Sequence, residues 1–375
     1  MNPTIFTIPI QQLASGDRLS IQVYKFISAN PGKKAYLQAN LHGAEIVGNA
    51  VIQQLIEFLL TIDDTQLHGE IWLVPVCNPV STNQRTHYFS TGRYNPSDGK
   101  DWNRIFWDFE KECDDLEEFA KSHIHLDIDA IRKEYFKRIK TSFDKLLEKI
   151  NSPSGVPFNE RYRYQLQSLC IDADYVIDIH SSSNQAIDYL YGFWRREESA
   201  KYFLLDYGIL LDEYDGDAFD EAFIKPWLAL EDHLEKLGNK IRFDIDSWTL
   251  ELGSGMQMNP ESVTKGGRGI KNYLAQKGML AISGFPLSET ASEKITFVSK
   301  STIIKYYAPV GGMIQARVAL GTSVKAGDKL YQVINFNKQD EFPIVIDICA
   351  EKAGLVFDVS TNHAVNEGEY VLSVM

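Results

Sequence analysis

Cysteine is scarce and dispersed in this sequence. Its four copies, Cys77, Cys113, Cys170 and Cys349, lie far apart and form no CxxC pair. Such spacing favours reduced, mostly buried thiols over disulfide bonds.

Positive charge is also in short supply. The chain has 38 Lys and Arg residues against 51 Asp and Glu residues, so its net charge is −13. A nucleic-acid backbone is bound by clustered basic residues, and we therefore expect no nucleic-acid partner. An anionic small substrate is compatible with this charge, because one or two local arginines outweigh the global field at short range.

Long apolar runs are absent as well. No uncharged apolar stretch reaches the roughly 18 residues of a membrane-spanning helix, and we expect no membrane partner. The N-terminal MNPTIFTIPIQQL has neither a basic start nor a long apolar segment, so we expect no signal peptide. These features predict a soluble, cytoplasmic protein.

The first eighty residues do carry a strand–helix–strand pattern. Residues 18–27 alternate apolar and polar, and AYLQANL is an apolar strand that leads into helical spacing from Glu45 to Leu60. GEIWLVPVCNP, around residues 70–77, is a second buried strand. This rhythm predicts an α/β sheet with functional groups at the carboxyl ends of its strands.

Later segments extend this pattern. Residues 108–150 are strongly charged, yet Leu, Ile and Phe recur at helical spacing, which predicts one or two long amphipathic helices on one flank of the sheet. A helix is expected at about 159–170 and a strand at 174–179. Residues 197–237 are predicted to be mostly helical, and WTLEL at 248–252 to be a short strand.

The C-terminal part contains two similar segments. Residues 306–334 and 348–374 each have an Ala, a Gly about four residues later, an alternating strand and a V-x-x-G-[DE] motif before a closing strand. Two such halves predict a small β-sandwich or barrel with a structural or oligomerising role. We therefore expect a catalytic domain at 1–296, with a helical insertion at 108–150, and a β domain at 297–375.

Three residues have the chemistry of a metal site. His42 and Glu45 follow the predicted strand AYLQANL, with Gly43 between them permitting a tight turn. His180 ends a second predicted strand, and Asp178 is a candidate partner for its ring. Two His and one Glu, with a position left for water, form a catalytic zinc site. One Zn²⁺ ion per chain is expected on His42, Glu45 and His180.

A carboxylate and basic groups complete the predicted site. Glu251 lies in the apolar TLELG strand, where burial raises a carboxyl pKa toward the range useful for a general base. Arg93, Asn103 and Arg104 are candidates for binding a carboxylate, with Arg85 as a less favoured rival of Arg93. No GxSxG motif accompanies the serines after His180, which are read as turn residues. The other six histidines have no partner at ligand spacing.

These motifs together resemble the succinylglutamate desuccinylase/aspartoacylase family, which belongs to the zinc carboxypeptidase-like superfamily. The residues that carry the resemblance are HGAE at 42–45, Asn78-Pro79, the R-x9-N-R pattern from Arg93 to Arg104, His180, and the T-x-E of TLELG. The resemblance implies a zinc carboxypeptidase-like α/β fold, a mixed sheet flanked by helices, with a small C-terminal all-β domain. It also implies zinc on His42, Glu45 and His180, Glu251 as general acid/base, Arg93 at the oxyanion, and Asn103 and Arg104 on the substrate carboxylate.

The implied function is zinc-dependent hydrolysis of the amide bond of an N-acyl amino acid by an activated water. A metallo-carboxypeptidase acting on short peptides is the nearest alternative, and a non-catalytic binding protein is a third. Two departures from the family pattern bear on the pocket. Trp102 stands where the family has Leu in DLNR, with an expected effect on the pocket wall, and the long segment 108–150 is expected to form a lid or an interface. The pattern is compatible with a homo-oligomer.

Overall fold

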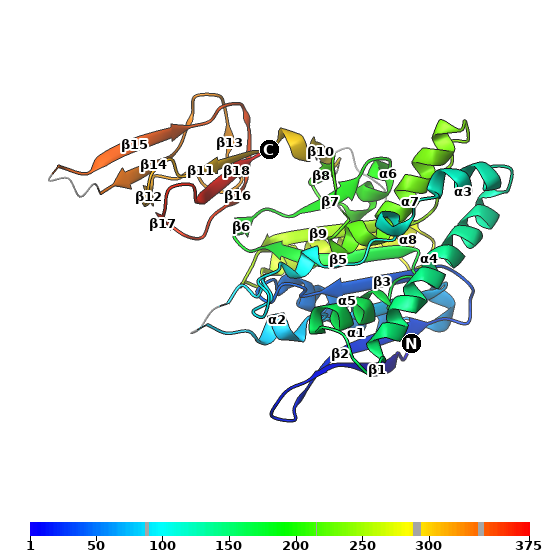
Figure 1. The fold of residues 1–375 in the computed structure, drawn as a ribbon. Helices are drawn as coiled ribbons and strands as arrows, with labels where there is room; N and C mark the ends of the chain where they lie inside the picture. The colour runs from blue at the N-terminus through cyan, green and yellow to red at the C-terminus, as the bar shows by residue number, and fades with distance from the viewer. Residues whose placement is uncertain (87–89, 215, 288–293, 337–340) are drawn as a thin grey trace.

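The computed structural model describes residues 1–86, 90–214, 216–287, 294–336 and 341–375. Its main feature is a nine-stranded mixed sheet with the strand order β1-β2-β4-β3-β5-β9-β7-β8-β10 (Figure 1). The strands of this sheet are β1 (Thr4–Gln12), β2 (Arg18–Ile27), β3 (Lys34–Ala39), β4 (Glu70–Val74), β5 (Tyr175–Ser182), β7 (Tyr189–Phe193), β8 (Tyr207–Leu211), β9 (Asp246–Ser254) and β10 (Thr296–Ser299).

Helices cover both faces of this sheet. The helices are α1 (Val47–Thr61), α2 (Pro79–Asn83), α3 (Leu116–His123), α4 (Ile128–Ile150), α5 (Phe158–Gln167), α6 (Glu197–Ala200), α7 (Phe219–Lys236) and α8 (Pro260–Gln276). Short 3₁₀ turns lie at Asp64–Gln66, Trp102–Arg104, Glu110–Glu112, Lys201–Phe203 and Lys300–Thr302. Among the described residues, no helix combines the length and the apolar character needed to cross a membrane.

The two faces of the central strands have different roles. On β5, Ile177 and Ile179 pack into the core formed with α1 and α8, whereas Val176 packs into a second core that includes residues of α5 and α7. Because side chains alternate along a strand, Asp178 and His180 face the same side as Val176. Strands β3, β5 and β9 run parallel, so their carboxyl ends meet at one edge of the sheet.

Most predicted elements are present in the structure. The strand before His42, the helix after it, the strand ending near His180 and the strand around Glu251 are β3, α1, β5 and β9. The prediction for 197–237 was wrong in part, because Tyr207–Leu211 forms β8 between β7 and β10. This apolar run is bounded by Asp206 and Asp212, and short apolar runs fit a buried strand as well as a helix.

The C-terminal region folds as two small antiparallel sheets. Its strands are β11 (Ile304–Tyr307), β12 (Gly312–Gln315), β13 (Ser323–Val324), β14 (Lys329–Asn335), β15 (Ile344–Cys349), β16 (Gly354–Val359), β17 (Ala364–Val365) and β18 (Tyr370–Val374). One sheet has the order β11-β18-β16-β13, and the other has the order β15-β14-β12-β17. Exchanging the two sequence repeats converts one order into the other. Each sheet therefore takes strands from both repeats, and neither repeat can form its sheet alone.

The division between the two predicted domains remains a prediction. Strand β10 spans the expected boundary at 296/297 and pairs with β8 in the large sheet. The chain leaves the large sheet after β10 and enters the C-terminal sheets at β11 (Figure 1).

Candidate metal and catalytic site

A strained turn at the end of β3 positions His42. Asn40 has a positive φ of 68°, and its Nδ2 donates to the carbonyl oxygens of His42 and Gly43, both at 3.1 Å. Thr82 Oγ1 in turn donates to Asn40 Oδ1 at 2.5 Å. Asparagine tolerates the left-handed region better than most residues because its short amide can bond to the local backbone.

Gly43 lets this turn approach the segment that starts at α2. A Cβ atom at Gly43 would lie 2.1 Å from the carbonyl oxygen of Ser81, so a side chain there would displace the backbone. The Asn78 side chain links the same two segments. Its Nδ2 donates to Leu41 O at 3.0 Å, and its Oδ1 accepts from Ser81 N–H at 3.1 Å. The Asn78-Pro79 motif thus supports the turn that carries His42 and Glu45.

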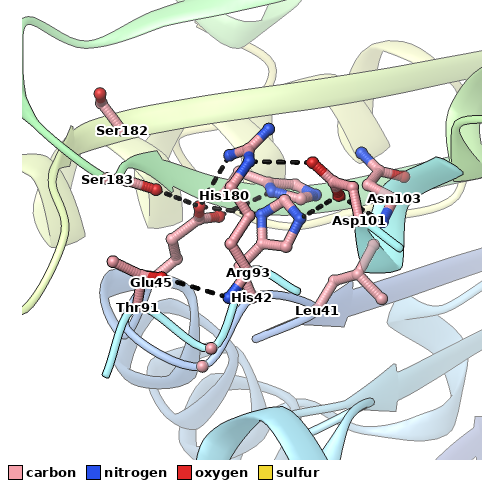
Figure 2. A network of polar contacts seen from close by, with 12 residues as sticks. Leu41, His42, Glu45, Thr91, Arg93, Asp101, Asn103, His180, Ser182 and Ser183 are labelled. Carbon is pink, nitrogen blue, oxygen red and sulfur yellow. Dashed lines mark hydrogen bonds and ion pairs between the residues drawn. The ribbon is translucent and has the colours of Figure 1, made fainter. Parts of the chain in front are cut away.

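His42, Glu45 and His180 meet at the carboxyl edge of the sheet (Figure 2). One ligand atom from each lies within 4.8 Å of the others, and all three residues are buried. His42 Nδ1 is 2.9 Å from Glu45 Oε1, and His180 Nδ1 is 2.7 Å from Glu45 Oε2. Two ring nitrogens and one carboxylate therefore converge on a single point.

An acidic partner holds the other nitrogen of each ring. His42 Nε2 lies 3.0 Å from Asp101 Oδ1, and His180 Nε2 lies 2.9 Å from Asp178 Oδ2. If both Nε2–H groups donate to these carboxylates, both neutral rings turn an Nδ1 lone pair toward the Glu45 carboxylate. A nitrogen lone pair and a carboxylate oxygen repel one another unless a cation or an extra proton lies between them. These residues therefore fit a divalent metal ion.

The titration of the group follows from the same contacts. Burial lowers the pKa of His42, but the charge of Glu45 and the bond to Asp101 outweigh it, so the pKa is raised. The pKa of His180 is raised in the same way by Asp178 and Glu45 against the effect of burial. Burial raises the pKa of Glu45, but the two imidazoles hold it well below its usual range. Both rings thus favour a bound cationic species, which a proton or a metal ion provides.

Glu251 lies beside this candidate metal-ligating group. In the sheet register, His180 on β5 and Tyr189 on β7 flank Glu251 on β9. Its Oε2 atom is buried and has no hydrogen-bond partner in the described part of the chain. Burial raises the pKa of this carboxyl from 4.5 to about 7. A carboxyl group with this pKa can accept and return a proton near neutral pH.

Arg93 also lines this part of the structure and contacts two acidic groups. Its Nε lies 2.9 Å from Asp101 Oδ2, and its Nη1 lies 3.9 Å from Glu45 Oε1 (Figure 2). Asp101 therefore links Arg93 to His42. The hydrogen bond from His42 and the charge of Arg93 hold the pKa of Asp101 at about 2, against the opposing effect of burial.

Asn103 and Arg104 line the same cavity from the turn that follows Asp101. Asn103 Oδ1 accepts from Phe219 N–H at 2.8 Å, which leaves the amide nitrogen as the group available to a ligand. Arg104 is exposed, and its Nη1 donates to Asn103 O at 2.6 Å. Its guanidinium group is thereby held at the cavity wall.

The seven predicted site residues surround one cavity of about 450 Å³. Sequence reasoning did not find several other residues of its wall. These are Tyr189, Tyr191, Leu211, Ala218, Asp220, Glu221, Thr249, Lys300, Lys305, Phe357, Asp358, Tyr370 and Ser373. Thr249 had a signal, because it points to the same face as Glu251 two residues later. The lining residues from the C-terminal sheets had none.

The structure differs from two expectations about the surroundings of the cavity. Trp102 is fully buried and packs edge-on against Phe158 and Tyr162, so it lies in the core and not in the pocket wall. Among the described residues that line the cavity, none comes from 108–150, which is evidence against a lid over this cavity, whereas the alternative role of the segment as an interface stays a prediction. Its helices α3 and α4 pack instead into a core shared with α7.

Among the other residues considered in the sequence, Arg85 and His123 are not part of the described cavity lining, whereas the serines after His180 are. Arg85 is exposed and donates to the carbonyl oxygens of Thr82 and Gln84. His123 stacks on Phe119 at a centroid distance of 4.0 Å, and His87 lies outside the described residues. All three serines after His180 line the cavity, and Ser183 Oγ is 3.4 Å from Glu45 Oε1.

Comparison with known proteins finds a family match in the part of the chain that contains most of the predicted site residues. Residues 31–144 match the succinylglutamate desuccinylase/aspartoacylase catalytic domain, a stretch that includes His42, Glu45, Arg93, Asn103 and Arg104. No curated protein sequence is matched.

Solved structures resemble the chain over almost its whole length. A protein of Shewanella amazonensis SB2B assigned to this family is 29% identical, with a TM-score of 0.86, and the match covers 99% of this chain and 98% of that one. A protein of Shewanella frigidimarina NCIMB 400 with the same assignment is 25% identical, with a TM-score of 0.88 and coverage of 100% and 97%. The ectoine utilization protein of Ruegeria pomeroyi, in a product-bound structure, is 18% identical with a TM-score of 0.66 and coverage of 100% and 95%, and shows the fold alone.

The mixed α/β fold with its C-terminal antiparallel sheets is thus shared with these structures. The resemblance predicted from the sequence is confirmed: residues 31–144 match the catalytic domain of the succinylglutamate desuccinylase/aspartoacylase family, and solved structures of proteins assigned to that family share the fold of this chain.

Proposed function

We propose that this protein is a zinc-dependent hydrolase that cleaves the amide bond of an N-acyl amino acid. The single observation that supports this most is the geometry around Glu45. Two buried ring nitrogens face its carboxylate while their opposite nitrogens bond to Asp101 and Asp178. The family match supports the class of reaction, deacylation of a small acyl amino acid.

His42, Glu45 and His180 are the residues that would hold the metal ion. Two imidazole nitrogens and a carboxylate suit zinc, although other divalent ions accept similar donors. When bound, such an ion would act as a Lewis acid and would lower the pKa of a water molecule bound to it from about 15.7 toward about 7. Asp101 and Asp178 fix the tautomers and ring orientations of the two histidines, which is the role that outer partners have in catalytic metal sites.

Glu251 is the residue that moves protons. Its carboxylate takes a proton from the attacking water and then returns it to the nitrogen of the leaving amine. The unpaired, buried Oε2 atom supports this role, since Glu251 is the register partner of His180 on the neighbouring strand. Its pKa of about 7 keeps both protonation states accessible at neutral pH.

Arg93, Asn103 and Arg104 orient the substrate. Arg93, held by Asp101, donates to the carbonyl oxygen that gains negative charge during attack. The Asn103 amide nitrogen and the Arg104 guanidinium bind the carboxylate of the amino acid, because a guanidinium fork matches a carboxylate. The proposed catalytic region is 1–296, with the C-terminal region at 297–375.

A substrate panel tests the proposal. The purified protein with bound zinc is incubated with N-acetyl, N-succinyl and other N-acyl amino acids, and in parallel with short peptides that have a free C-terminus. We expect release of free amino acid from at least one N-acyl amino acid, with much lower kcat/KM for peptides. Preferential cleavage of peptides would show a carboxypeptidase, and no hydrolysis of either class by the zinc-loaded protein would contradict the proposal.

The pH dependence follows from Glu251. A general base works only after it loses its proton, so kcat/KM should rise with pH and level off once Glu251 is ionised. Burial places its pKa at about 7 in the metal-free site, and a bound cation lowers this value. We therefore expect the half-point of the acidic limb at or below pH 7, measured as kcat/KM between pH 5 and 9. The residual kcat/KM of Glu251→Gln should lack this acidic limb. An acidic limb that persists in the variant would assign the titration to another group.

A further inference from the structure

The C-terminal sheets are joined by backbone bonds to the segment that directly follows β5. Strand β16 pairs with β6 (Gln185–Ala186), with Asp358 opposite Ala186 and Val359 opposite Gln185. Ile187 N–H also donates to Phe357 O at 3.0 Å. The C-terminal region therefore extends its own sheet with residues that lie only a few positions after His180.

At this junction, one buried carboxylate bonds to both regions. Asp358 is 8% exposed, and its oxygens accept from Ser182 Oγ, from Asn184 Nδ2 at 3.1 Å and from Tyr370 OH at 2.5 Å. Ser182 is the last residue of β5, and its Oγ also accepts from Asn184 N–H at 3.1 Å. The carboxylate thus fixes the segment 182–184 through two side chains, and Tyr370 fixes the carboxylate.

The same segment contacts the proposed metal ligands on its other side. Ser183 Oγ lies 3.4 Å from Glu45 Oε1, and Figure 2 shows Ser183 directed at that carboxylate. The C-terminal region also contacts the strand beside the proposed base, because Phe357 packs edge-on against Tyr189 at 5.5 Å and Tyr189 is the register partner of Glu251. The C-terminal region therefore supports both the ligand strand and the strand beside Glu251.

We propose that Asp358 is a positioning residue that holds segment 182–184 against the metal-ligating group, so that the C-terminal sheets complete the active site. Loss of its carboxylate would remove the acceptor that the half-buried donors of Ser182 and Asn184 share, and the segment would then be held to β16 by fewer bonds. The end of β5 would then loosen two residues after His180. This inference rests on the proposed metal site, and it adds an active-site role to the structural or oligomerising role expected for this region.

A double-mutant cycle on the full-length protein tests this inference. The variants are Asp358→Ala, Ser182→Ala and the double variant, with Asp358→Asn as the conservative replacement. Asp347→Ala is the matched control, since Asp347 is an exposed aspartate of the same sheets that bonds to Lys329 and Gln332, away from the cavity. Two readouts are needed: zinc affinity by competition with a chelator, and hydrogen exchange of the amides of Asn184 and Ile187.

We expect Asp358→Ala to weaken zinc binding about tenfold, the lower end of the range for partners of metal ligands, and to speed exchange at both amides. Asp358→Asn should restore part of the affinity, and Asp347→Ala should match the wild type. The fold-loss of zinc affinity in the double variant should be smaller than the product of the two single fold-losses, because both substitutions remove the same contact between Ser182 and Asp358.

Three results would have distinct meanings. Unchanged exchange or independent effects of the two substitutions would overturn the positioning role. Faster exchange with unchanged zinc affinity would show a purely structural contact and would also overturn it. A wild-type protein that binds no divalent ion would refute the proposed metal site, and with it the positioning role that depends on that site, whatever the exchange shows. If Asp358→Ala does not fold, Ser182→Ala and Asp358→Asn give the same comparison.

Discussion

Replacing Glu251 with Gln is expected to lower kcat by about 10²–10⁴-fold while zinc remains bound, because the amide cannot accept and return a proton. Gln has nearly the same shape, so the neighbouring His180 and Tyr189 keep their positions in the sheet register. The measurement is kcat on the best N-acyl amino acid, with zinc content determined on the same sample. Glu261→Gln is a control, since Glu261 is an exposed residue in the first turn of α8.

The same variant should not lose stability. Burial raises the folded pKa of Glu251 from 4.5 to about 7, so the neutral carboxyl favours folding below pH 4.5 and this contribution is lost as pH rises through 7. Gln is neutral at every pH. Metal-free Glu251→Gln should therefore be at least as stable as the metal-free wild type at pH 8, measured by urea unfolding. Full turnover in a zinc-loaded Glu251→Gln variant would remove Glu251 from the chemistry.

Replacing His180 with Asn should abolish tight zinc binding and, with it, hydrolysis. Removing a ligand should cost more than the roughly 10–100-fold in affinity that removal of an outer partner costs. Asp178→Asn removes such a partner, because Asp178 Oδ2 lies 2.9 Å from His180 Nε2. We therefore expect a graded series, with affinity falling from wild type to Asp178→Asn and then to His180→Asn.

Chelator competition measures this series, and activity after back-titration with zinc provides a second readout. The exposed His125, replaced by Asn, controls for loss of an imidazole elsewhere in the chain. If His180→Asn bound zinc as tightly as the wild type, His180 would not be a ligand and the three-residue site would be wrong.

The sequence was informative where chemistry and periodicity coincide. His42, Glu45 and His180 each follow or end an apolar run, and parallel strands bring their carboxyl ends to one edge, so their convergence could be expected before any coordinates. The β-strands of the C-terminal repeats could also be predicted, because each half has glycines and strands at the same spacing. Strand β8 was missed, since a five-residue apolar run has no period that separates strand from helix.

Long-range contacts were beyond such reasoning. The side chain of Trp102 points into the core although its neighbours Asp101 and Asn103 face the site, and a local motif does not reveal which way each side chain turns. Asp101 stood in the recognised motif, but its bonds to both His42 and Arg93 depend on how two separate turns meet. The contact of Asp358 with Ser182 joins residues 176 positions apart, and no pattern in either segment indicates it.

Anomalous diffraction from crystals of the zinc-loaded protein tests the central claim most directly. We predict one zinc peak per chain, about 2.0–2.2 Å from His42 Nδ1, His180 Nδ1 and a Glu45 oxygen, with Asp101 and Asp178 still on the Nε2 atoms. A zinc ion bound elsewhere, or no ion while both Nδ1 atoms stay on the Glu45 carboxylate, would contradict the account.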